Sequence, residues 1–339
     1  MLKLAVSYAA STQHMPYFVK ALQNCAVKPG ETVLIHTDTE SYPHYPAAFL
    51  GAARMLDADA YILVHPIDVP EKGAIKAWQS ANLVIDLSSE PHAYAEILRE
   101  AINAGARILR VGQPWDVMKR LFPTPELKQR VMAGGAIMEK GTKLRITSPG
   151  GTNLSIRKGK RYTMKIWGGS DTPGRWDIWP SGMVCCAPEE NSAEGTLVVD
   201  KGDVLLSMAH YVEDPITMKV KDGLIIEITG KGKDADLLKQ WLGKTGHPDA
   251  FRISHVGWGC NDKAHWDRLA MSPRFGFATQ DNEAFYGNMQ IAFGSNYGIF
   301  PDGQTKCPSH IDFPCRQNSF WVDDTQIMEQ GKFVRPELQ

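Results

Sequence analysis

The chain has 339 residues, of which 43% are hydrophobic and 22% charged, and its formal net charge at pH 7 is −1. A chain of this length can form one large or two moderate domains around a sizeable core. It has no basic stripe and no apolar run near the roughly 20 residues of a membrane span, which argues against nucleic acid as the main partner and against a membrane protein.

The N-terminal residues 1–6 soon give way to polar Ser7 and Ser11, and they lack the apolar stretch and cleavage site of a signal peptide. We therefore expect a cytoplasmic protein. The six cysteines show no repeated spacing typical of a zinc site, so we expect reduced and mostly buried thiols. Cys307 and Cys315 flank the most distinctive motif of the chain, and a structural or redox role for them stays open.

Helical and strand patterns alternate as far as residue 111. Each expected strand is short and continuously apolar, which is typical of a strand buried on both faces of a parallel sheet. A stretch with helical spacing of apolar residues precedes each one. The expected helices are 14–25, 46–56, 75–81 and 92–104, and the expected strands are 32–36, 60–64, 83–87 and 107–111.

This alternation predicts an α/β fold in which residues 1–130 form a Rossmann-like parallel-sheet domain. No Gly-x-Gly-x-x-Gly motif follows the first strand, so a dinucleotide is not inferred. Beyond a helical stretch over 112–140, the strands become short and alternating, as in the hairpin pattern of 218–228 with Asp222-Gly223 at its turn. Residues 233–243 read as an amphipathic helix. We therefore expect residues 131–339 to form an α+β domain rich in antiparallel sheet.

The motif His310-Ile311-Asp312 places an imidazole and a carboxylate on one side of an extended strand, because side chains there repeat every second residue. His255 is the candidate for a third ligand. It closes the β-type run 251–254 and opens an expected Gly257-Trp258-Gly259 turn. Two histidines and one carboxylate suit non-haem Fe(II). On pattern alone, a strand with no metal remains an alternative.

Two further histidines are candidates for a role in the site. His92 follows the strand 83–87 at its carboxyl end, where open α/β sheets place functional residues. His265 lies close in sequence to His255 and is expected to begin a short helix. His36 and His210 end or interrupt apolar runs and are expected to be core histidines.

The order and spacing of several short motifs resemble those of the aminopeptidase T-like metallopeptidases and of their oxygenase relatives, the 2,5-dihydroxypyridine 5,6-dioxygenases. The resemblance covers most of the chain and is most specific from about residue 175 to 313. The motifs that carry it are Pro180-Ser181-Gly182, Ala187-Pro188-Glu189, Gly195-Thr196, Gly257-Trp258-Gly259-Cys260-Asn261, Gln290-Ile291-Ala292-Phe293-Gly294 and His310-Ile311-Asp312.

The chain departs from the peptidase pattern at three positions. The peptidases hold two metals and carry glutamate where this chain has Met183 and His255, and histidine where it has Gln290. These changes remove ligands that a two-metal hydrolytic site needs. The closing His310-x-Asp312 persists. The resemblance to the oxygenases therefore implies a single Fe(2+) held by His255, His310 and Asp312.

The implied reaction is the cleavage of 2,5-dihydroxypyridine by O2 to N-formylmaleamate, as in nicotinate or nicotine degradation. The resemblance also implies that the protein is a homo-oligomer. His92 or His265 would accept the hydroxyl proton, since the pKa of histidine lies near working pH. Other side chains are candidates to orient the substrate or pack against its ring, although ordinary structure is the favoured interpretation of each. These are Ser295, Gln290, Asn261, Trp258, Tyr286 and Phe293.

Two alternatives stay open from the sequence. One is a metallopeptidase or other hydrolase with an altered metal set. The other is a binding protein that has lost its metal, which the retained ligand types of His255, His310 and Asp312 disfavour.

Overall fold

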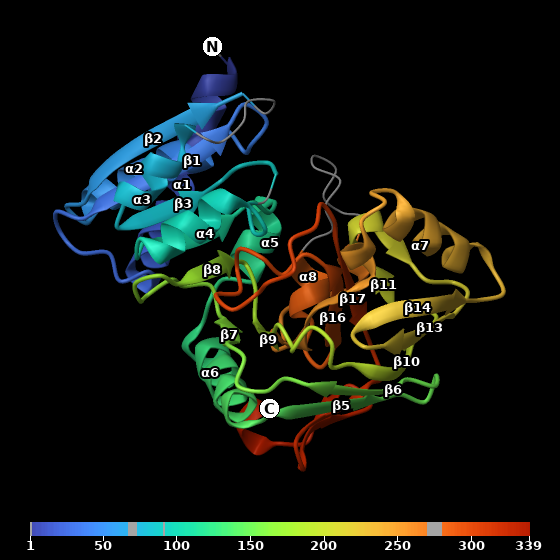
Figure 1. The fold of residues 1–339 in the computed structure, drawn as a ribbon. Helices are drawn as coiled ribbons and strands as arrows, with labels where there is room; N and C mark the ends of the chain where they lie inside the picture. The colour runs from blue at the N-terminus through green and yellow to red at the C-terminus, as the bar shows by residue number, and fades with distance from the viewer. Residues whose placement is uncertain (1, 67–72, 91, 270–279) are drawn as a thin grey trace. The chain divides into compact units, whose positions relative to one another are not determined.

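The computed structural model describes residues 2–66, 73–90, 92–269 and 280–339, with side chains from residue 12 onward. The chain divides into two compact units (Figure 1). Unit 1 comprises Met1–Pro123 and Trp167–Pro180, and unit 2 comprises Thr124–Ile166 and Ser181–Gln339. The expected boundary after residue 130 falls inside a helix, and the segment 167–180 returns to unit 1 because one of its strands joins the first sheet. No helix in the described part of the chain is long and apolar enough to cross a membrane.

Unit 1 is built on a five-stranded sheet whose order is β2-β1-β3-β4-β8 and whose pairs are all parallel. This confirms the predicted α/β architecture of the N-terminal half. Its strands are β1 (Thr32–Asp38), β2 (Asp59–His65), β3 (Leu83–Asp86), β4 (Arg107–Val111) and β8 (Trp176–Trp179). Its helices are α1 (Leu2–Asn24), α2 (Tyr45–Met55), α3 (Ile75–Ser80), α4 (Glu96–Asn103) and α5 (Trp115–Arg120).

The two faces of this sheet carry different side chains. Val33, Ile35 and Ile85 belong to one buried apolar cluster with residues of α1 and α2. Because side chains alternate along a strand, His36 and Asp86 lie on the opposite face, where they occupy paired positions of β1 and β3. The helix expected from residue 92 starts only at Glu96, so His92 lies in the loop after β3.

Unit 2 contains antiparallel sheets, as the sequence predicts. The Asp-Gly hairpin is confirmed, since Lys221 pairs with Leu224 across residues of positive φ. The eight-stranded sheet has, in order, β14 (Leu224–Thr229), β13 (Ile216–Lys221), β10 (Glu194–Val199), β6 (Asn153–Arg157), β5 (Lys143–Thr147), β18 (Ser319–Val322), β19 (Thr325–Glu329) and β20 (Lys332–Phe333). A two-stranded sheet pairs β11 (Val204–Leu205) with β12 (His210–Tyr211).

A second five-stranded sheet of unit 2 positions the predicted metal ligands. Its order is β17 (His310–Cys315), β16 (Met289–Gly294), β15 (Ile253–Gly259), β9 (Met183–Cys186) and β7 (Thr163–Ile166). The helices of unit 2 are α6 (Pro125–Lys140), α7 (Lys233–Gly243) and α8 (Gln280–Ala284), and short 3-10 helices cover Leu206–Met208, Pro248–Phe251, Trp266–Arg268 and Pro336–Leu338.

The turn expected at residues 257–259 is wrong, because these residues continue strand β15. Gly257 is needed there for a close approach rather than for a turn. A Cβ atom at this position would lie 1.9 Å from the carbonyl oxygen of Val184 on β9. Glycine inside a strand often marks such a contact between backbones.

Candidate metal centre

Two groups in the described part of the chain bring together two histidines and one aspartate whose ligand atoms lie within 4.8 Å of one another. One is His255, His310 and Asp312 of unit 2, as predicted. The other is His36, Asp86 and His92 of unit 1. The hydrogen bonds around each group decide which of them suits a metal.

The unit 2 group lies on one face of three adjacent strands. His255 of β15 pairs with Ala292 of β16, and Ala292 pairs in turn with Asp312 of β17. Paired residues share a face, so the small Ala292 side chain leaves space between the two larger ones. The Nε2 atom of His255 lies 3.1 Å from Oδ1 of Asp312, and Nε2 of His310 lies 3.1 Å from Oδ2.

A β-bulge aims His255 at this site. Ile253 pairs with Phe293, but His255 pairs with Ala292, so β15 contains one extra residue at Ser254. Residues two apart on a regular strand share a face, and the bulge reverses this relation. Ile253 therefore shares a face with Phe293, while His255 shares the face of Asp312.

The backbone around His310 sets its tautomer for metal binding. Its Nδ1 lies 2.8 Å from the carbonyl oxygen of Ser295, and a carbonyl can only accept, so Nδ1 carries the proton. In the neutral ring, the lone pair of Nε2 then faces the Asp312 carboxylate. Two electron-rich atoms at 3.1 Å are stabilised by a cation between them. An Nδ1–H bond to a carbonyl is also the usual support of a metal-bound histidine.

The pKa shifts of His255 and Asp312 also favour metal binding. Burial lowers the pKa of His255, which favours the neutral form that binds metals. Burial alone would raise the pKa of Asp312, but His310 and a hydrogen bond from His255 hold it well below its usual range. The donor set comprises two imidazoles and one carboxylate, which fits a divalent transition metal.

Two neighbouring side chains complete the surroundings of Asp312. Gln290, on β16, donates from Nε2 to Oδ1 of Asp312 at 2.9 Å. Burial and the charge of Asp312 raise the pKa of Glu283, on α8, to about 8. Sequence reasoning did not find Glu283, because its proximity to Asp312 depends on how α8 packs.

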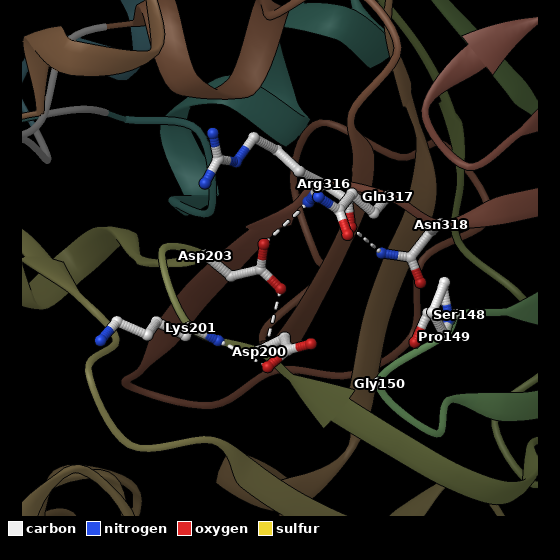
Figure 2. A pocket seen from close by; sticks show the side chains of 9 residues that line it. All are labelled: Ser148, Pro149, Gly150, Asp200, Lys201, Asp203, Arg316, Gln317 and Asn318. Carbon is white, nitrogen blue, oxygen red and sulfur yellow. Dashed lines mark hydrogen bonds between the residues drawn. The ribbon is translucent and has the colours of Figure 1, made fainter.

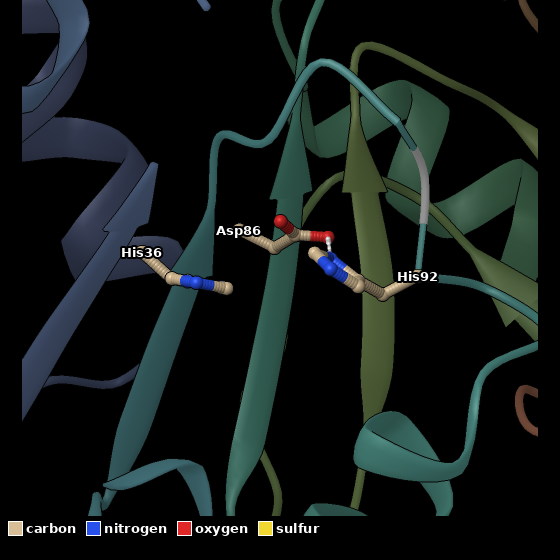
Figure 3. Close-up of side chains that lie close together, drawn as sticks. All are labelled: His36, Asp86 and His92. Atoms are coloured by element: carbon tan, nitrogen blue, oxygen red, sulfur yellow. Dashed lines mark hydrogen bonds and ion pairs between the residues drawn. The ribbon is translucent and has the colours of Figure 1, made fainter. Parts of the chain in front are cut away.

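The unit 1 group lies at the carboxyl ends of β1 and β3 (Figure 3). Its three side chains are almost fully buried, with exposed fractions of 0% for His36, 1% for Asp86 and 3% for His92. Nδ1 of His92 lies 3.1 Å from Oδ2 of Asp86, and the rings of His36 and His92 stack at 5.4 Å. The Arg110 guanidinium lies 3.6 Å from Oδ1 of Asp86.

The hydrogen bonds of this group disfavour metal binding. Trp78 donates its indole N–H to Nδ1 of His36 at 3.1 Å, so the neutral His36 ring carries its proton on Nε2. The lone pair that a metal would need is then already engaged by the indole. His92 donates from Nδ1 to Asp86, which leaves the lone pair on its Nε2. Although burial would raise the pKa of Asp86, His92 and Arg110 hold it well below its usual range.

The other predicted polar site residues, Ser295, His265 and Asn261, lie in different surroundings. Ser295 supports His310 through its carbonyl oxygen, and its hydroxyl donates to the carbonyl of Thr305 at 3.1 Å. His265 is exposed. Asn261 bridges its own loop to the Ser181 carbonyl.

The three aromatic residues proposed to pack on the substrate ring have contacts of ordinary structure. Trp258 packs edge-on against Phe320, and Phe293 contacts Phe313. The hydroxyl of Tyr286 donates to the Leu338 carbonyl. All six cysteines are free thiols; Cys307 is half-buried and the other five are buried, as the sequence predicts.

His36 and Asp86 are functional candidates that sequence reasoning missed. His36 was expected to be an ordinary core histidine. The available signal was that both residues stand at the carboxyl ends of neighbouring apolar strands, as His92 does.

A small polar pocket of unit 2 has a structural explanation (Figure 2). Its volume of about 40 Å³ is enough for only a few water molecules. Asp203 accepts the backbone N–H groups of Arg316 at 2.8 Å and of Asp200 at 2.9 Å, so this carboxylate joins two loops. Burial raises its pKa to about 6.

Comparison with known proteins assigns the chain to a family. Residues 13–335 match the family model described as 2,5-dihydroxypyridine 5,6-dioxygenase. A protein of that name from Pseudomonas putida KT2440 is 34% identical over 264 residues, which cover 78% of this chain and 74% of the relative. The solved structure of the Pseudomonas putida dioxygenase matches with a TM-score of 0.90 and 29% identity, covering 97% of this chain and 99% of the other.

A more distant likeness shows the fold alone. AmpT from Thermus thermophilus matches with a TM-score of 0.63 and 14% identity, over 95% of this chain and 100% of that protein. The family model, by contrast, spans nearly the whole sequence, and the relative at 34% identity covers more than two thirds of it. The chain therefore belongs to the 2,5-dihydroxypyridine 5,6-dioxygenase family.

Proposed function

We propose that this protein is a non-haem Fe(II) dioxygenase that opens the ring of 2,5-dihydroxypyridine to give N-formylmaleamate. The observation that carries the proposal is the lone pair of His310 directed at the Asp312 carboxylate, with His255 on the same face. This donor set has the composition that suits non-haem iron in oxygen chemistry. Membership of the dioxygenase family supports the substrate assignment.

His255, His310 and Asp312 are the proposed ligands. Bound Fe(II) supplies the redox chemistry that allows O2 to react with a closed-shell aromatic ring. Ser295 contributes by holding His310 through its carbonyl oxygen.

The proposed reaction balances without another co-reactant. The C5–C6 bond breaks, both atoms of O2 enter the product, and 2,5-dihydroxypyridine plus O2 gives N-formylmaleamic acid. The ring is the electron donor and O2 the oxidant. A base must accept the proton of the substrate hydroxyl during this change.

His92 is the proposed base. Its Nδ1–H is held by Asp86 at 3.1 Å, which selects the neutral tautomer whose proton-accepting lone pair is on Nε2. His265 stays a second candidate with less support, because its ring is exposed and no side-chain hydrogen bond within the described part of the chain fixes its tautomer. A cytoplasmic location, a homo-oligomeric state and a role in N-heterocycle degradation also stay predictions.

Peptidase activity is not favoured. The likeness to AmpT concerns the fold. Met183 and Gln290 stand where the peptidase pattern has glutamate and histidine, and Met183 is an apolar, buried side chain. A two-metal hydrolytic site needs more ligands than this chain retains.

An oxygen electrode and metal analysis test the proposal. The purified protein is stripped of metal, reloaded anaerobically with Fe(II), and mixed with 2,5-dihydroxypyridine and O2. We expect equimolar consumption of O2 and substrate, and a product with the mass of N-formylmaleamate. Full ring-cleaving activity in iron-free protein, or no O2 uptake with Fe(II), would refute it.

A further inference from the structure

Gln290 stands in the middle of the sheet that carries the metal ligands, and its side chain has an unusual hydrogen-bonding state. It is 1% exposed and lies on β16, between β15 and β17. Its register partners are Gly257 and Pro314. Asp312 is two residues before Pro314, so the Gln290 and Asp312 side chains are diagonal neighbours on one face.

The Asp312 carboxylate fixes the orientation of the Gln290 amide. A carboxylate oxygen of an ionised aspartate only accepts hydrogen bonds, so the atom 2.9 Å from Oδ1 must be the NH2 group. The same Oδ1 atom lies 3.1 Å from Nε2 of His255. Gln290 therefore contacts the ligand oxygen that faces His255.

The other end of the amide is left without a protein donor. Among the described residues, Oε1 of Gln290 is buried and has no hydrogen-bond partner. Leaving a buried acceptor unsatisfied costs about 1–3 kcal/mol. A glutamine that served only the fold would be expected to pair both ends, so this arrangement points to a partner beyond the described residues.

We infer that Gln290 is a positioning residue of the metal centre, which holds Asp312 through Nε2 and presents Oε1 to a hydrogen-bond donor of the bound substrate. The chemistry required of that donor is an O–H or N–H group, which a hydroxylated pyridine carries. Oε1 is two covalent bonds from the nitrogen that contacts Asp312, so its ligand must bind beside that carboxylate.

The inference deepens the proposed function and rests on it for the identity of the substrate. Its first part, that Gln290 positions Asp312, concerns metal binding and can be tested without measuring enzymatic activity. Hydrogen bonds to metal-binding carboxylates typically affect metal affinity by 10–100-fold when they are removed.

Gln290→Met tests both parts, because methionine has a similar length and flexibility but can neither donate nor accept strongly. The matched control is Gln326→Met, since Gln326 is a half-buried glutamine of the same unit whose Nε2 lies 3.4 Å from the Met328 carbonyl. Co(II) and Fe(II) affinities are measured by competition with a chelator, and the visible spectrum of the Co(II) form reports the geometry of the site.

We expect Gln290→Met to weaken metal binding by about 10–100-fold and to change the Co(II) spectrum, while the control matches the parent protein. Thermal unfolding of the metal-free forms shows whether either variant merely loses stability. A metal affinity within twofold of the parent, with an unchanged spectrum, overturns the positioning role.

The second part, that Oε1 of Gln290 accepts a hydrogen bond from the substrate, is tested by measuring the anaerobic binding of 2,5-dihydroxypyridine at saturating metal. We expect about tenfold weaker binding to Gln290→Met, which is one lost hydrogen bond at the usual net value. Unchanged substrate affinity overturns the acceptor role. If the parent protein binds metal as expected but neither binds nor cleaves the pyridine, the proposed function fails while the positioning result still stands.

Discussion

Replacing Asp86 with asparagine tests the proposal that Asp86 orients His92 for proton transfer. The substitution keeps the shape of the side chain but removes its charge. An asparagine NH2 group facing His92 would donate to Nδ1 and move the ring proton to Nε2. His92 would then present a proton where the proposed mechanism needs a lone pair.

The size of the effect follows from the contacts of Asp86. Loss of a general base lowers rate by about 10²–10⁴-fold, so we expect kcat to fall in this range. Breaking a buried ion pair costs about 3–5 kcal/mol. We expect the lower end for Asp86, because Arg110 keeps a hydrogen bond to its backbone carbonyl at 3.2 Å.

The assay combines steady-state rates over a range of pH with chemical denaturation of each variant. Asp59→Asn is the control, since Asp59 is an exposed aspartate of the same sheet. A depressed carboxyl pKa contributes stability that is present above the unfolded value and lost as pH falls. Asp86→Asn should therefore flatten the loss of stability on the acid side, below about pH 4.

Two results separate activity from stability. If Asp86→Asn is folded and its kcat is within twofold of the parent value, the tautomer argument is wrong. If kcat falls but the pH profile keeps its shape and only the folded fraction drops, Asp86 is a structural residue and His92 is not oriented by it.

Three other predictions use simpler measurements. His310→Ala should lose bound iron in metal analysis, because two ligands remain, whereas His265→Ala should retain it; equal iron contents would count against the assigned ligands. Gly257→Ala should lower the melting temperature by several degrees, because the added Cβ would lie 1.9 Å from the Val184 carbonyl oxygen and overpacking costs about 1–3 kcal/mol. An unchanged melting temperature would show that β9 and β15 separate freely. Asp203 binds a proton more tightly in the folded state, with a pKa of about 6, so the free energy of unfolding should fall as pH rises from about 4 to 6. Asp203→Asn should weaken this pH dependence in urea titrations, and an unchanged pH dependence would refute the role of Asp203.

The sequence predicted the parallel sheet of unit 1 because fully buried strands have continuously apolar patterns that need no knowledge of packing. Four of its strands lie where the pattern places them. The fifth, β8, could not be assigned to this sheet, since it is separated from β4 by unit 2 elements and joins through pairing alone. The prediction of a turn after His255 was wrong for a related reason. Glycine indicates a position where a Cβ atom is excluded, and only the position of β9 shows that a neighbouring strand excludes it at Gly257.

The sequence by itself determined the fold class and the proximity of His310 and Asp312, because alternation along a strand is a local property. Tertiary structure decided the rest of the site. The bulge at Ser254 aims His255, and the Ser295 carbonyl selects the tautomer of His310. Trp78 gives His36 the opposite tautomer, so two groups of the same composition differ in chemistry. Such preferences depend on which donors and acceptors surround a ring, and these come from distant parts of the chain.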